Sequence, residues 1–164
     1  MKTTEMRNEL IQLGGGAHAL AIQIMGNSHD AADAVQDALT HALEKPAAYQ
    51  AAKGPLKPWF MRLVRNRCID LMRRRRPSGV AIETLADPGK GPEKAAEAAD
   101  RDRVLKQALA SLDPDQRQIV VLRDYMDLSY AEIADVLDIA AGTVMSRLHR
   151  ARTSLGLAYR KYDD

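Results

Sequence analysis

The sequence is poor in cysteine and in aromatic residues, and each shortage narrows the possible folds and chemistry. Its 164 residues include one cysteine, one tryptophan and one phenylalanine. The single thiol, Cys68, excludes an internal disulfide and is typical of a protein in a reducing cytoplasm. Runs of valine, isoleucine, threonine and aromatic residues are nearly absent, so we expect an all-α fold.

Long apolar runs and metal-ligand patterns are also missing. No stretch is apolar over the length that a bilayer requires, and the opening MKTTEMRNEL lacks the apolar segment of a signal peptide. The four histidines are scattered and show no metal-ligand spacing with the cysteine. Since no catalytic nucleophile or phosphate-binding loop is evident either, we expect no metal, no cofactor and no enzyme activity.

The formal net charge is only +2, but the charges are unevenly distributed, and residues 143–152 contain basic residues without any carboxylate. A helix-turn-helix is predicted at residues 128–155, LSYAEIADVLDIAAGTVMSRLHRARTSL, with its turn at 138–140. Ser129 and Glu132 form a capping box at its start. The second helix has an apolar stripe of Val144, Leu148, Ala151 and Leu155. Its outer face is polar or cationic and carries Thr143, Met145, Ser146, Arg147, His149, Arg150 and Arg152. Such a helix suits the major groove of DNA, although a solvated helical hairpin is the alternative.

A glycine triplet at 14–16 interrupts a helical pattern over residues 6–25. Three glycines cost a helix about 3 kcal/mol relative to alanine, so we expect a break there and a second helical piece at 17–25. Gly26 is predicted to end this piece, and Ser28 is predicted to cap the next helix.

The predicted helix at 28–44 has an apolar stripe and an acidic side. The stripe contains Ala32, Val35 and Leu39. The acidic side carries Asp30, Asp33, Asp37 and Glu44 at helical spacing. Like charges at this spacing repel one another. The pattern is typical of a docking surface for a basic partner, and equally of a solvated acidic face.

The most basic segment is the predicted helix 59–76, WFMRLVRNRCIDLMRRRR, with seven arginines against one aspartate. Prolines and a glycine before it predict a loop at 45–58. Four adjacent arginines exceed what the helix dipole needs, so we predict a phosphate-binding surface. For Trp59, a place in the core is favoured over a base contact.

Residues 78–99 lack periodicity and contain several prolines and glycines, which indicates a flexible linker. It separates two expected domains, at 1–77 and 100–162. The expected fold is therefore all-α, with two small helical domains and the helix-turn-helix in the second.

Together these segments resemble the extracytoplasmic-function (ECF) sigma factors of bacterial RNA polymerase, which retain conserved regions 2 and 4. DAADAVQDAL at 30–39 resembles the family's polymerase-docking helix. WFMRLVRNRCIDLMRRRRP at 59–77 resembles its Trp-x(6)-Asn-x(3)-Asp-x(2)-Arg helix, and residues 111–155 resemble the region 4 signature. Residues 1–77 thus correspond to region 2 and residues 100–162 to region 4.

The resemblance implies an alternative sigma factor that directs promoter-specific initiation under the control of an anti-sigma factor. It implies a cytoplasmic, nucleoid-associated protein that an anti-sigma factor can hold near the membrane. Core polymerase would bind through its clamp and its flap, the clamp contacting Asp33, Gln36 and Asp37. Minus-ten DNA would contact Tyr49, Lys53, Trp59, Arg62, Arg65, Asn66 and Arg73. Minus-thirty-five DNA would contact the outer face of the helix-turn-helix defined above.

Three positions depart from the family pattern. Met145 stands where a basic residue is usual, so one DNA contact is lost or replaced by an apolar contact to a thymine methyl. Asp138 stands where the turn usually has glycine, although aspartate tolerates the left-handed conformation. The glycine triplet is expected to shorten the first helix of region 2.

Two other classes of protein compete with this interpretation. A free-standing helix-turn-helix regulator would need a dimerisation element and a ligand or receiver domain, and the sequence offers neither. An interaction protein that only occupies a sigma-binding surface would not need basic faces in both halves.

Overall fold

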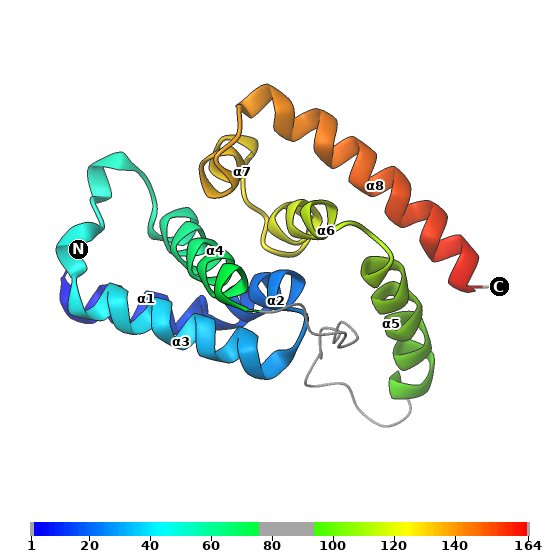
Figure 1. Cartoon of the computed structure of the whole chain (residues 1–164), viewed down its shortest axis with the longest axis horizontal. Helices are drawn as coiled ribbons and strands as arrows, with labels where there is room; N and C mark the ends of the chain where they lie inside the picture. The colour runs from blue at the N-terminus through cyan, green and yellow to red at the C-terminus, as the bar shows by residue number, and fades with distance from the viewer. Residues whose placement is uncertain (1, 76–93, 164) are drawn as a thin grey trace.

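The computed structural model describes residues 2–75 and 94–163, and every regular element within these ranges is helical. The N-terminal half contains α1 (Thr3–Gln12), α2 (Gly14–Met25), α3 (Ser28–Glu44), the short 3-10 turns η1 (Pro46–Ala48) and η2 (Ala51–Lys53), and α4 (Leu56–Arg74). The C-terminal half contains α5 (Lys94–Ala110), α6 (Pro114–Val120), the π-helical turn η3 (Val121–Tyr125), α7 (Tyr130–Leu137) and α8 (Ala141–Asp163) (Figure 1). The expected all-α fold is confirmed.

The glycine triplet lies inside a helix. The break that we predicted at 14–16 occurs at Leu13, and the three glycines form the first turn of α2. Met6 and Leu10 of α1 are buried in the same core as Leu20 of α2. Burial of these side chains fixes both helices, so tertiary packing outweighs the poor helix propensity of glycine.

The start and the buried face of α3 both differ from the prediction. Gly26 ends α2 with a left-handed φ of 84° as expected, but Asn27 caps α3 in place of Ser28, its side chain accepting from the Asp30 amide at 2.8 Å. Ala32 is exposed. The buried stripe is made of small residues, Ala31, Ala34, Ala38 and Ala42. Small side chains on this face allow the neighbouring helices α2 and α4 to approach closely.

Helix α4 begins at Leu56, inside the predicted loop, and contacts α1, α2, α3 and α7. Pro58 is accommodated because the first turn of a helix has no intrahelical acceptor for its amide. Phe60, Met61 and Val64 are fully buried. Toward the C-terminal end of α4, Met72 is 42% exposed and does not belong to the core.

Helix α5 begins at Lys94, within the segment predicted to be a linker. The helix therefore starts before residue 100, where we expected the second domain to begin. Residues 78–93 of the predicted linker lie outside the described residues.

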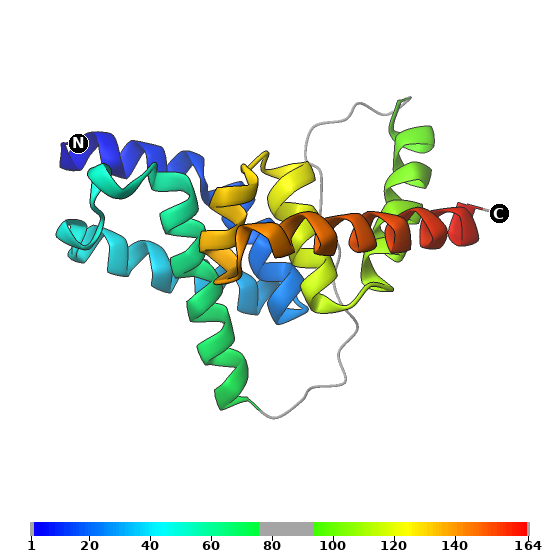
Figure 2. The same cartoon turned by 90° about the horizontal axis from the view of Figure 1, so that it is seen from above.

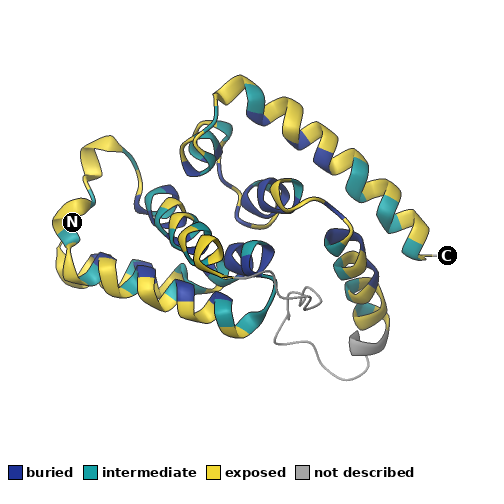
Figure 3. Ribbon diagram, viewed as in Figure 1, coloured by how far each residue is buried: buried dark blue, intermediate teal, exposed yellow. Residues whose placement is uncertain are grey.

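The predicted helix-turn-helix is present as α7 and α8. The capping box is complete: the Ser129 hydroxyl accepts from the Glu132 amide at 3.1 Å, and Glu132 Oε1 accepts from the Ser129 amide at 2.8 Å. Asp138 adopts the left-handed conformation with φ 56°, as its tolerance predicted. Helix α8 then runs along the molecule past α7 and α6 to α5 (Figure 2). Its inner stripe, Val144, Leu148 and Ala151, is buried, and its outer side is exposed (Figure 3).

Replacement of Leu148 by alanine tests this packing. Leu148 is 1% exposed, so its truncation leaves a cavity and should lower the free energy of unfolding by about 2–5 kcal/mol. Leu157 lies in the same helix but is 62% exposed, which makes Leu157→Ala the matched control. Urea unfolding followed by circular dichroism measures both. Equal losses would contradict the burial of this face of α8.

The thiol of Cys68 should be unreactive in the folded protein. Its side chain is fully buried in α4, and burial raises the pKa of the Cys68 thiol to about 12. Because the thiolate is the reactive form, labelling with a disulfide reagent in mildly alkaline buffer should be negligible until urea unfolds the chain. Rapid labelling of the native protein would show that this part of α4 opens.

Candidate functional site

A pocket of about 390 Å³ opens where the segment before α4 meets the first turns of that helix. Tyr49 and Trp59 meet at its wall with their ring centroids 5.3 Å apart. The Tyr49 hydroxyl donates to the Gly54 carbonyl at 2.8 Å, which closes the loop between them. Gly54 has φ 142°, a conformation that residues with a side chain rarely adopt. An aromatic wall held this way can stack against a base.

Cations stand at the same pocket. Lys53 and Arg62 are exposed and line it beside Tyr49 and Trp59. Four of the residues predicted to contact minus-ten DNA are therefore brought together. Trp59 is half-buried and packs against the core while also lining the pocket, so it meets both of the alternatives considered for it.

The other three predicted minus-ten residues lie elsewhere on α4. Asn66 and Arg73 are exposed on its surface. Arg65 is half-buried, and its Nε donates to Gln118 Oε1 of α6 at 2.8 Å. Burial lowers the pKa of the Arg65 guanidinium. Arg65 is thus held by the C-terminal half of the chain.

The acidic side of α3 carries the three residues predicted to bind polymerase. Asp33 and Gln36 are exposed, and the Asp33 side chain retains 66% of its accessible surface. Asp37 is bridged by Arg67 of α4, with 2.9 Å between Arg67 Nη2 and Asp37 Oδ2. This role of Arg67 was not expected. At helical periodicity Arg67 lies on a different side of α4 from Arg62 and Arg73, and this could have indicated that it faces α3.

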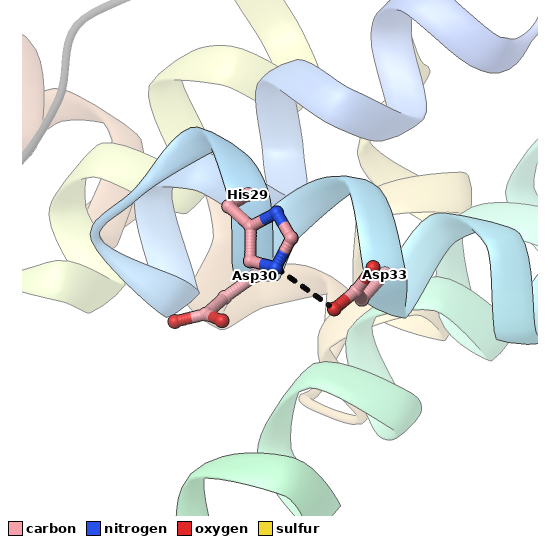
Figure 4. Close-up of side chains that lie close together, drawn as sticks. All are labelled: His29, Asp30 and Asp33. Atoms are coloured by element: carbon pink, nitrogen blue, oxygen red, sulfur yellow. Dashed lines mark ion pairs between the residues drawn. The ribbon is translucent and has the colours of Figure 1, made fainter.

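A cluster of possible metal ligands lies at the start of α3, although the sequence showed no such spacing. His29, Asp30 and Asp33 each place one ligand atom within 4.8 Å of the others (Figure 4). The Asp30 carboxylate is already used, because it accepts from the Arg75 guanidinium and from Nδ2 of the Asn27 side chain. These two hydrogen bonds, that of Arg75 first, hold the pKa of Asp30 well below its usual range. The cluster is therefore explained by an ion pair at a helix N-terminus.

The outer face of α8 presents most of the residues predicted to contact minus-thirty-five DNA. Six of these seven are exposed and the seventh, Thr143, is half-buried. Met145 is 60% exposed, so an apolar side chain stands among polar ones. Arg147 and Arg150 line a second hollow of about 170 Å³ against Asp115, Gln116 and Ile119 of α6. A basic, exposed face on the second helix of a helix-turn-helix has the geometry of a groove-reading element.

Arg152 is engaged within the chain. Its Nη2 lies 2.5 Å from Asp124 Oδ1 in η3, and this hydrogen bond raises the pKa of the Arg152 guanidinium. The ion pair anchors α8 to the turn before α7. A phosphate contact by Arg152 would have to compete with Asp124.

Residues at the contact between the halves were not singled out by the sequence. Glu132 and Asp135 of α7 line the Tyr49–Trp59 pocket, and Arg117 and Gln118 of α6 are buried. Glu132 was assigned only to the capping box. The burial of these two α6 residues gives no signal in the sequence, because it depends on distant segments: Gln118 accepts from Arg65 of α4, and Arg117 donates to the Gln23 carbonyl of α2.

Among the described residues, no helix is both long enough and apolar enough to cross a membrane.

Comparisons with known proteins agree with the two-part organisation. Residues 12–77 match the family model Sigma-70 region 2, and residues 102–155 match Sigma-70, region 4. The chain is 35% identical over 147 residues to the ECF RNA polymerase sigma factor SigE of Mycolicibacterium smegmatis, covering 84% of this chain but 55% of that protein. It is 35% identical over 141 residues to the ECF RNA polymerase sigma factor SigL of Mycobacterium tuberculosis, covering 84% of this chain and 78% of that protein.

Solved structures extend the likeness to the fold. The sigma factor RpoE from Bartonella quintana, solved in complex with the anti-sigma factor NepR, superposes with a TM-score of 0.75 at 27% identity, over 95% of this chain and 97% of that one. CnrH, solved with the cytosolic domain of CnrY, has the same fold, with a TM-score of 0.66 at 24% identity over 95% of this chain and 88% of that one. The chain therefore belongs to the ECF sigma factors of bacterial RNA polymerase.

Proposed function

We propose that this sigma factor divides its work between its halves as the resemblance implied. Residues 1–77 act as region 2, which docks on core polymerase and holds the minus-ten element. The C-terminal half, from α5 to residue 162, acts as region 4, which reads the minus-thirty-five element. A free-standing regulator is not favoured, because such a protein has no use for a region 2.

The observation that carries this proposal is the pocket beside α4. An extruded base of the non-template strand stacks between or against Tyr49 and Trp59, while Lys53 and Arg62 attract its phosphates. Asn66 and Arg73 follow the backbone along the exposed side of α4. Promoter melting then draws on the binding energy of the captured base, and the chain contributes no bond-making chemistry.

The polymerase contact is assigned to the exposed acidic side of α3. Asp33 and Gln36 are exposed outside the α3–α4 packing. Asp37 is also exposed on α3 and is paired with Arg67 of α4. The clamp of core polymerase is the expected partner, and the flap positions region 4. This assignment places the chain in the cytoplasm with the polymerase.

An anti-sigma factor is the expected regulator. RpoE and CnrH, which share this fold, were solved with the anti-sigma factor NepR and with CnrY. We therefore expect a small protein partner that blocks polymerase docking or promoter binding.

Charge reversal on α3 tests the docking surface. Wild-type chain added to purified core polymerase on fragmented genomic DNA should give transcripts from discrete start points. Asp33→Lys together with Asp37→Lys should abolish these transcripts and the binding of core polymerase, because two attractive charges become repulsive. Transcripts are mapped by sequencing their 5′ ends, and binding is measured by gel filtration.

The matched control reverses two exposed acidic residues far from α3, Glu97→Lys and Asp163→Lys. It should leave transcription intact. Undiminished polymerase binding by the α3 variant would refute the docking surface, and failure of the wild-type chain to produce any defined start would refute the proposed function.

Replacement of Arg150 tests the minus-thirty-five contact. If Arg150 makes a specific base contact, Arg150→Ala should weaken binding to the mapped upstream duplex by about 1–3 kcal/mol and leave binding to a scrambled duplex nearly unchanged. Fluorescence anisotropy measures both duplexes. Arg160→Ala, an exposed arginine in the last turn of α8, is the control. Equal losses on both duplexes would make Arg150 a phosphate contact.

A further inference from the structure

The surface of α8 has two sides that differ in charge. On one side, Arg147 and Arg150 line the hollow of about 170 Å³ against α6. On the other side lie Met145, His149 and Arg152, which follow one another at steps of four and three residues and therefore share one side of the helix. The buried stripe of α8 runs between these two sides. Each side can therefore contact a different part of a DNA groove.

The arginine on the Met145 side is paired within the chain. Arg152 Nη2 lies 2.5 Å from Asp124 Oδ1, and Arg152 Nε donates to Asp124 Oδ2 at 3.1 Å, so both carboxylate oxygens are engaged. Such a bidentate pair neutralises the guanidinium and holds it toward η3. Two turns before it, Met145 is 60% exposed. Near the start of α8, this side therefore presents an apolar side chain.

The polar neighbours of Met145 on the outer face are limited to hydrogen bonding. The Ser146 hydroxyl donates to the Thr143 carbonyl at 3.1 Å, so toward a base its oxygen can only accept. Arg150 Nε donates to the Ser146 carbonyl at 3.4 Å, which leaves the two Nη groups to donate to a base or phosphate. Neither Ser146 nor Arg150 offers an apolar end to DNA, whereas Met145 does.

The chemistry of Met145 matches one group on the bases. In the major groove, the apolar group that base pairs present is the C5-methyl of thymine. The first residues of the second helix are the ones that approach base edges in a helix-turn-helix, and Met145 lies near the start of α8. Its unbranched thioether adapts to the shape of an apolar partner. Contact with a methyl group would remove apolar surface of both partners from water.

We propose that Met145 is a specificity-determining residue that reads the methyl group of a thymine in the minus-thirty-five element. A basic residue at this position would add a contact that salt weakens. Met145 instead selects a base pair without adding to the electrostatic binding of DNA. The inference rests on the proposed reading of the minus-thirty-five element by α8.

Replacement of thymidine by deoxyuridine tests the contact, because it removes only the methyl group. Holoenzyme is assembled from core polymerase and the full chain, and the probe is a promoter fragment whose start point has been mapped. Each thymine of the upstream element, on either strand, is replaced in turn. One replacement should weaken wild-type binding about fourfold, the ratio that corresponds to burial of one methyl group. Replacements between the two promoter elements should leave binding unchanged. Gel-shift titration measures the affinities.

Variants of Met145 assign the effect to this side chain. Met145→Ala should bind the thymine fragment about fourfold more weakly than wild type and should bind the thymine and deoxyuridine fragments equally. Met145→Leu keeps an apolar side chain and should retain the discrimination. Leu157→Ala is the matched control, since Leu157 is 62% exposed on the same helix outside the predicted DNA face, and it should behave as wild type. Circular dichroism checks that the variants fold.

A fragment with a scrambled upstream element separates the possible failures. If scrambling leaves wild-type binding unchanged, the proposed role of α8 fails, and the inference fails with it. If scrambling weakens binding but no deoxyuridine replacement does, only the methyl contact is overturned. The same conclusion follows if Met145→Ala keeps the wild-type discrimination, or if the mapped upstream element contains no thymine on either strand.

Discussion

The structure depends on the burial of α4 from several sides at once. Phe60, Met61 and Val64 are removed from water by α2 and α3 on one side and by α7 on the other. A half of this size has little apolar surface of its own to bury, and small domains are marginal for that reason. Sharing α4 between the halves enlarges the core, and this sharing brings α7 to the pocket.

The arginines of α4 also pair with the acidic side of α3. Arg67 of α4 and Arg75, which caps its C-terminus, bridge to Asp37 and Asp30 of α3, while Arg62 lines the pocket. The arginines thus have different roles, which a count of charges along the sequence does not distinguish. Those that face α3 stabilise that helix, Arg65 ties the halves together, and the exposed ones are those we propose to meet nucleic acid.

Local rules predicted the features that local interactions control. The capping box at Ser129, the left-handed Asp138 and the buried stripe of α8 follow from neighbours within a few residues. The aromatic and basic members of the pocket were found through the family resemblance. The predicted apolar stripe of α3 was wrong. The helix buries other alanines and leaves Ala32 exposed, because the neighbouring helices require small side chains on the face that meets them.

The sequence by itself determined the helical class, the helix-turn-helix and the family, because periodicity, capping and motif spacing are written in contiguous residues. Only the tertiary structure decided that Arg65 and Arg117 are occupied, and that Glu132 and Asp135 stand at the pocket. These facts depend on contacts between residues far apart in the chain. Such contacts are selected by the fit of whole surfaces, and no periodicity along the sequence records them.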